Sequence, residues 1–124
     1  MKASACRLAV CAGLISAANS ALAAVGWTAP SHIQSVFYIA QNALGHSAGD
    51  FELQLTSPMT LPTGVSCDTL YITTAAANDL DKKMFAMAMA AQATRSPVTL
   101  AITDDPALTA VSGRCSLIAI NITQ

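Results

Sequence analysis

Charged and aromatic side chains are scarce in this sequence. Asp, Glu, Lys and Arg make up 10% of its 124 residues, and Phe, Trp and Tyr make up 5%. A protein that binds nucleic acid needs a basic patch for the phosphates, and one that binds single strands also needs rings on which bases stack. The chain has six lysines and arginines against seven carboxylates. We therefore expect no nucleic-acid partner.

The sequence also has no phosphate-binding loop, no Cys-x-x-Cys motif and no group of histidines and cysteines at metal-ligand spacing. We therefore expect no cofactor. Residues 45–49, Gly-His-Ser-Ala-Gly, match the G-x-S-x-G pattern of serine hydrolases, but that pattern needs a helix after the serine and a later histidine. His32 and His46 both precede Ser47. We interpret the segment as a glycine-rich turn and each histidine as a polar surface residue, and we expect no enzymatic activity.

Residues 1–23 have the three parts of a secretory signal peptide. Lys2 and Arg7 supply the positive end, residues 8–18 form an almost unbroken apolar run, and residues 21–23, Ala-Leu-Ala, suit a signal peptidase. The apolar run is shorter than the roughly 20 residues that span a bilayer, which argues against a permanent anchor and against stable membrane insertion. We predict cleavage before Ala24, with a cut one residue later as the alternative, and export by the Sec pathway to the periplasm or the medium.

Residues 24–124 then form a single small domain with four cations against seven carboxylates. Cys6 and Cys11 leave with the leader, and Cys67 and Cys115 remain. Two cysteines in an oxidising compartment predict a disulfide, whereas a metal site or a reactive thiol has no supporting ligand nearby. A disulfide that closes the loop between Cys67 and Cys115 stabilises the fold by roughly 4 kcal/mol, which matters for a domain with a modest core.

Alternation of apolar and polar residues predicts five strands, and a change of period predicts one helix before Pro97, with Asn78 as its N-cap. The predicted strands are 33–43, 51–56, 67–73, 98–103 and 115–122, and the predicted helix is 80–94. In the second strand Phe51, Leu53 and Leu55 should face the core. The order β-β-β-α-β-β favours a five-stranded barrel of the OB type. The alternative is an α+β sheet with the helix on one face.

The predicted helix has no charged residue between Met84 and Ala91. An apolar stripe at helical spacing consists of Leu80, Met84, Met87, Ala88 and Ala91, with Phe85 and Met89 beside it. A helix on the surface of a monomer usually keeps a polar face, although scattered apolar residues are tolerated there. The other interpretation is that a second face packs against another subunit, with Met84, Phe85, Met87 and Met89 as the candidate oligomer interface.

One motif of the C-terminal half extends from Cys67 to Ile120. It reads Cys67…Phe85-x-x-x-x-x-Ala91…Ser96-Pro97-Val98-Thr99-Leu100…Cys115…Ile118-x-Ile120. This pattern is similar to the B subunits of bacterial AB-type toxins of the subtilase-cytotoxin and pertussis-like group, and to related small exported proteins. The resemblance implies an OB-fold subunit that forms a ring with its helices around the pore and binds glycans. The aromatic-rich segments and the sugar site of that group have no match here, so no binding residue is carried over.

Together these features predict an exported, non-enzymatic binding or assembly module. It would recognise a glycan or a protein surface, as a homo-oligomer or with an exported enzyme as partner. The alternative is a stand-alone periplasmic or secreted protein, such as an inhibitor or an envelope accessory factor.

Overall fold

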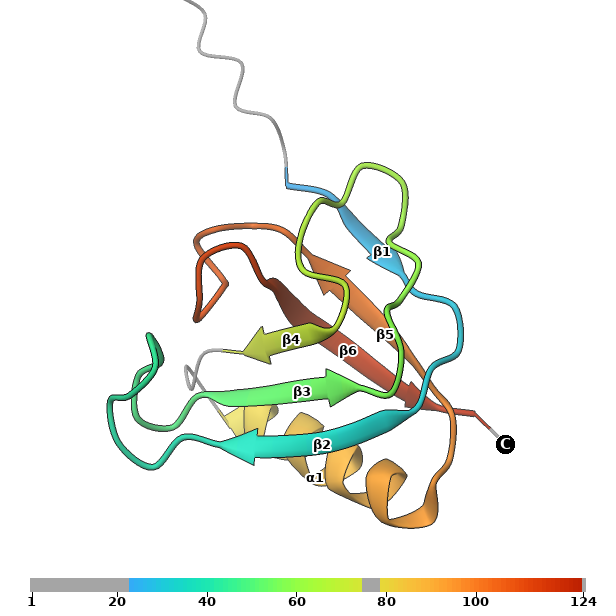
Figure 1. Cartoon of the computed structure of the whole chain (residues 1–124), viewed down its shortest axis with the longest axis horizontal. Coiled ribbons are helices and arrows are strands. Elements are labelled where there is room, and N and C mark those ends of the chain that lie inside the picture. Colours follow the sequence, from blue (N-terminus) through green and yellow to red (C-terminus); the bar gives the residue numbers. More distant parts are fainter. Residues whose placement is uncertain (1–22, 75–78, 124) are drawn as a thin grey trace, which may run out of the picture.

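The computed structural model describes residues 23–74 and 79–123, which form a six-stranded sheet with a helix packed on one face (Figure 1). The elements along the chain are β1 (Val25–Trp27), β2 (Ile33–Tyr38), β3 (Phe51–Leu55), β4 (Tyr71–Thr74), α1 (Asp79–Thr94), β5 (Val98–Thr103) and β6 (Cys115–Ile122). The strand order is β1-β5-β6-β4-β3-β2, and all neighbours are antiparallel except β4 and β6. Among these residues, no helix is both long and apolar enough to cross a membrane.

The expectation of a mainly β fold with one helix is confirmed, whereas a closed five-stranded barrel is not. The sheet is open and mixed, and β1 and β2 form its two edges. The sixth strand, β1, was not predicted because its three residues are too few for a period to be detected. Within β1, Gly26 leaves space for Pro62, which would lie 2.3 Å from a Cβ atom at that position. The predicted leader up to residue 22 and the predicted N-cap Asn78 lie outside the described residues.

The core lies between the sheet and α1. Phe51, Leu53 and Leu55 of β3 are buried, as predicted, and they meet fully buried side chains of the central strands. The helix contributes Ala88 and Ala91, whose small side chains let it lie close to the sheet. The Phe85 ring contacts the rings of Phe51 and Tyr38 edge to face, at centroid distances of 5.6 and 5.9 Å. Each such pair contributes about 0.5–1.5 kcal/mol beyond the area that it buries.

The predicted disulfide between Cys67 and Cys115 is present, with its Cα atoms 5.4 Å apart. Cys115 begins β6, but Cys67 lies before β4 rather than in it, because the predicted third strand begins only at Tyr71. The reason is an Asx turn in which the Asp68 carboxylate accepts hydrogen bonds from the backbone N–H groups of Leu70 and Tyr71. The disulfide therefore joins the loop before β4 to the strand that lies parallel to β4.

Candidate functional site

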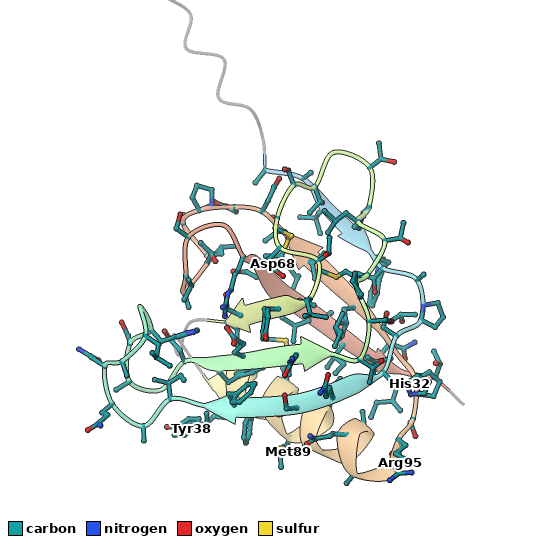
Figure 2. All side chains as sticks on the ribbon, in the orientation of Figure 1. His32, Tyr38, Asp68, Met89 and Arg95 are labelled. Atoms are coloured by element: carbon teal, nitrogen blue, oxygen red, sulfur yellow. A yellow bond between two sulfur atoms is a disulfide. The ribbon has the colours of Figure 1, made fainter. Side chains whose placement is uncertain are left out.

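A polar groove lies between the C-terminal end of α1 and the start of β2. It has a volume of about 710 Å³ and is lined by His32, Ile33, Gln34, Thr56, Gln92, Ala93 and Arg95. Figure 2 shows His32 and Arg95 at the same end of the molecule, where the helix finishes beside the edge of the sheet. The groove is thus built from three segments that are distant in the sequence.

Hydrogen bonds hold these segments together. The Gln92 side chain donates to the backbone carbonyl of Gln34 at 2.8 Å, which ties the helix to the edge strand β2. The N–H of Thr56 donates to the carbonyl of His32 at 3.0 Å. The pairing of β2 with β3 is irregular between Ile33 and Ser35, and such a bulge turns neighbouring side chains away from the regular alternation. Hydrogen bonds to the backbone carbonyls of Gln34 and His32 therefore hold the two sides of the groove in place.

Arg95 takes up an unusual backbone position at the edge of the groove. Its φ angle is +53°, in the left-handed region, and it directly follows the last helical residue, Thr94. The N–H of Ser96 donates to the carbonyl of Ala91, and the N–H of Arg95 donates to the carbonyl of Gln92. These two bonds form a Schellman motif, in which glycine is the usual left-handed residue. The helix therefore ends at Thr94, as predicted, and Arg95 is the first residue after it.

The groove offers both donors and acceptors of hydrogen bonds and carries no carboxylate among its lining residues. Gln34 and Gln92 have amide side chains, Thr56 has a hydroxyl, and His32 and Arg95 supply ring and guanidinium N–H groups. Both His32 and Arg95 are exposed and form no ion pair within the described part of the chain. In residues 23–74 and 79–123, no group of three His, Cys, Asp or Glu side chains is suited to a metal ion.

A second polar cluster, here called the ionic network, lies on the opposite face of the sheet from α1. It consists of His46, Asp50, Glu52, Tyr71 and Arg114. His46 Nε2 lies 3.3 Å from a Glu52 carboxylate oxygen, and His46 Nδ1 lies 3.8 Å from a carboxylate oxygen of Asp50. Glu52 also forms an ion pair with the guanidinium of Arg114. His46 is only 7% exposed, so its interpretation as a surface residue is wrong.

Arg114 connects the ionic network to the middle of the sheet. Its guanidinium lies over the Tyr71 ring at 4.7 Å, and the Tyr71 hydroxyl accepts a hydrogen bond from Gln54. Burial lowers the pKa of the Arg114 guanidinium below its ordinary value, because the charged form loses water. The contacts with Glu52 and Tyr71 offset that loss. The network holds the loop before β3 and the loop before β6 against the sheet.

Ser47, in the G-x-S-x-G segment, is exposed, and its backbone N–H donates to the Asp50 carboxylate at 2.7 Å. The segment is followed by β3 rather than by the helix that a nucleophile elbow requires. The turn interpretation of the segment therefore agrees with its geometry.

The four residues of the candidate oligomer interface divide between two sides of α1. Met84 and Phe85 are half-buried and pack against the core, whereas Met87 and Met89 are 38% and 42% exposed. Ala86, Ala90 and Ala93 are also exposed, and with Met87 and Met89 they form what we call the outer helix face. Tyr38, 61% exposed, lies beside this helix through its contact with Phe85 (Figure 2).

Comparison with known proteins gave no match to a family model, to a curated protein or to a solved structure.

Proposed function

We propose that the protein is an exported, non-enzymatic binding module that recognises a glycan in the groove between α1 and β2. The single observation that carries this proposal is the lining of the groove. It combines two amides, a hydroxyl, an imidazole and a guanidinium, and includes no carboxylate. Sugar hydroxyl groups both donate and accept hydrogen bonds. Amide side chains such as those of Gln34 and Gln92 also carry both a donor and an acceptor, so they can pair with either.

The proposal includes an OB-like barrel of the kind found in toxin B subunits. Two observations support it. The helix lies between β4 and β5 in the chain, and it is followed by β6, which pairs parallel with β4. Ser31 also exchanges two backbone hydrogen bonds with Val98 of β5, at 2.9 and 2.8 Å. The chain that leads into edge strand β2 thus contacts the opposite half of the sheet.

The proposal also includes self-association through the outer helix face, with a second copy of the chain as occupant. No charged side chain occurs from Met84 to Thr94, so two such faces meet without repulsion between like charges. Native mass spectrometry of the purified protein should show an oligomer, and a Met87→Lys, Met89→Lys variant should shift it to monomer. The matched control is Leu108→Lys, which adds charge at an exposed leucine outside the helix. A wild-type protein that is monomeric at micromolar concentration contradicts this part.

A glycan array tests the binding function. The full chain is expressed with its own leader, purified from the periplasm of a bacterial host, labelled and applied to the array. Replacing Gln34 by Ala removes one amide side chain from the groove but keeps the backbone carbonyl that accepts from Gln92, and it should weaken binding to any positive glycan by about tenfold. Gln41→Ala, at an exposed position in the loop after β2, is the matched control and should bind like wild type. An array without a positive glycan contradicts glycan binding and favours the stand-alone accessory or inhibitor role.

A further inference from the structure

The conformation of Arg95 is unfavourable for its side chain. An L-residue with a φ angle of +53° brings its Cβ close to the following carbonyl, and glycine avoids this cost. The chain nevertheless has arginine at the left-handed position of the Schellman motif. Backbone outliers of this kind are found preferentially at functional sites, where the surrounding structure compensates for them.

Interaction with the helix dipole does not explain the arginine. A cation near a helix C-terminus is favourable, but a residue within the last turn obtains the same benefit without a positive φ angle. Ala93 and Thr94 occupy such positions here. The Arg95 side chain, moreover, is exposed and has no hydrogen-bond or ion-pair partner in residues 23–74 and 79–123. Its guanidinium is therefore accessible to a group outside the fold.

We propose that Arg95 and His32 bind a carboxylate group of the ligand in the groove between α1 and β2. This inference rests on the proposed function and adds the charge of the ligand to it. The guanidinium presents parallel N–H groups that match the two oxygens of a carboxylate. His32 supplies a further N–H from the other side of the groove, and no lining residue repels a negative charge.

The helix end itself opposes a negative ligand, because unpaired carbonyls carry partial negative charge. In this structure two of these carbonyls are already occupied. Those of Ala91 and Gln92 accept the N–H groups of Ser96 and Arg95. The Schellman motif thus both positions Arg95 and reduces the repulsion that a carboxylate would meet.

The test uses two sugars, methyl β-glucoside and methyl β-glucuronide, which differ only in that the second has a carboxylate in place of a hydroxymethyl group. Each sugar is titrated at constant ionic strength into the ¹⁵N-labelled protein as purified after export. The glucuronide should shift the amide signals of Gln34 and of residues 92–96 and bind about tenfold more tightly than the glucoside. In Arg95→Gly, which suits the left-handed position, this preference should disappear. Lys83→Ala removes one positive charge from an exposed position near the other end of the helix and should keep the preference.

Sodium acetate and sodium phosphate, titrated in the same way, distinguish a carboxylate from a phosphate. Acetate should shift the same amides, and a response to phosphate alone overturns the inference. Equal binding of the two sugars also overturns it, while leaving the proposed glycan function in place. If neither sugar nor acetate shifts these amides, the inference fails, and a positive glycan array would then show that the proposed function stands without it.

Discussion

The two histidines of the chain each share a site with an arginine. The two sites differ in whether these side chains are paired with a carboxylate and in how far they are exposed to solvent. In the ionic network, His46 and Arg114 both contact Glu52 and are held against the sheet. In the groove, His32 and Arg95 are exposed and contact no carboxylate among the described residues. The same residue types are therefore paired within the fold at one site and left exposed at the other.

This difference follows from the cost of burying charge. A group removed from water must recover its hydration from partners in the protein, so a buried arginine without a carboxylate destabilises the fold. An exposed arginine keeps its water and contributes little to stability. We therefore expect changes in the ionic network to alter stability and changes in the groove to alter binding. The predictions below test this division, from the largest expected effect to the smallest.

Loss of the disulfide should have the largest effect. Replacing Cys67 and Cys115 together by Ala frees a loop closed across a sequence separation of 48 residues, which should lower the free energy of unfolding by about 4 kcal/mol. Arg114 directly precedes Cys115, so the ionic network should also loosen. Chemical denaturation measures the first effect. The His46 ring signals in NMR spectra report the second and should move more than those of His32.

Ser66→Ala, next to Cys67, is the control for this pair and should leave both measurements unchanged, because the hydrogen bond at Ser66 comes from its backbone N–H. A loss of less than 1 kcal/mol in the cysteine variant would show that contacts between β4 and β6 alone hold the two segments together.

Glu52→Gln should have the next largest effect. It removes the carboxylate that Arg114 and His46 share and leaves the arginine charge without compensation. Breaking a fully buried ion pair costs 3–5 kcal/mol, but a quarter of the Arg114 side chain is exposed, so we expect a loss of about 2 kcal/mol. A double-mutant cycle with Arg114→Met measures the coupling. Additive effects of the two substitutions would contradict the pairing.

The two histidines provide a matched comparison. His46→Gln replaces a buried ring that lies between two carboxylates and should lower the free energy of unfolding by about 1 kcal/mol. His32→Gln changes an exposed side chain and should stay within about 0.5 kcal/mol of wild type. Denaturation of both variants under the same conditions measures the difference. Equal losses would contradict the division between a structural and a binding site.

Local sequence patterns were sufficient for most of the elements. The strict alternation in β3 and the apolar strands β5 and β6 gave bounds that agree with the structure to within one residue, and α1 begins one residue before its predicted start. The predicted bounds were wrong for two strands. The strand predicted at 67–73 begins only at Tyr71, because the Asp68 carboxylate accepts hydrogen bonds from the backbone before β4. The strand predicted at 33–43 ends at Tyr38, because the chain bends soon after that residue.

Neither polar site was predictable from the sequence, because each depends on contacts between distant segments. His46 reaches Glu52 only when the loop before β3 folds over the sheet, and nothing in its neighbours signals burial. The groove needs α1 to finish beside β2, where the Gln92 to Gln34 hydrogen bond joins the two elements. One local signal was available. A helix that ends at a Ser-Pro pair without glycine leaves its last left-handed position to Arg95.

Arg95→Gly should change stability by less than the loss of the disulfide or of Glu52, and it should have the opposite sign. Glycine adopts a φ angle of +53° without steric cost, and this gain exceeds the greater entropy of glycine in the unfolded chain. We expect the free energy of unfolding to rise by about 0.5–1 kcal/mol. Ala90→Gly, at an exposed position inside α1, is the control and should lower it by about 1 kcal/mol. If Arg95→Gly is destabilising instead, the arginine side chain stabilises the fold through the helix end, and the groove then resembles the ionic network rather than contrasting with it.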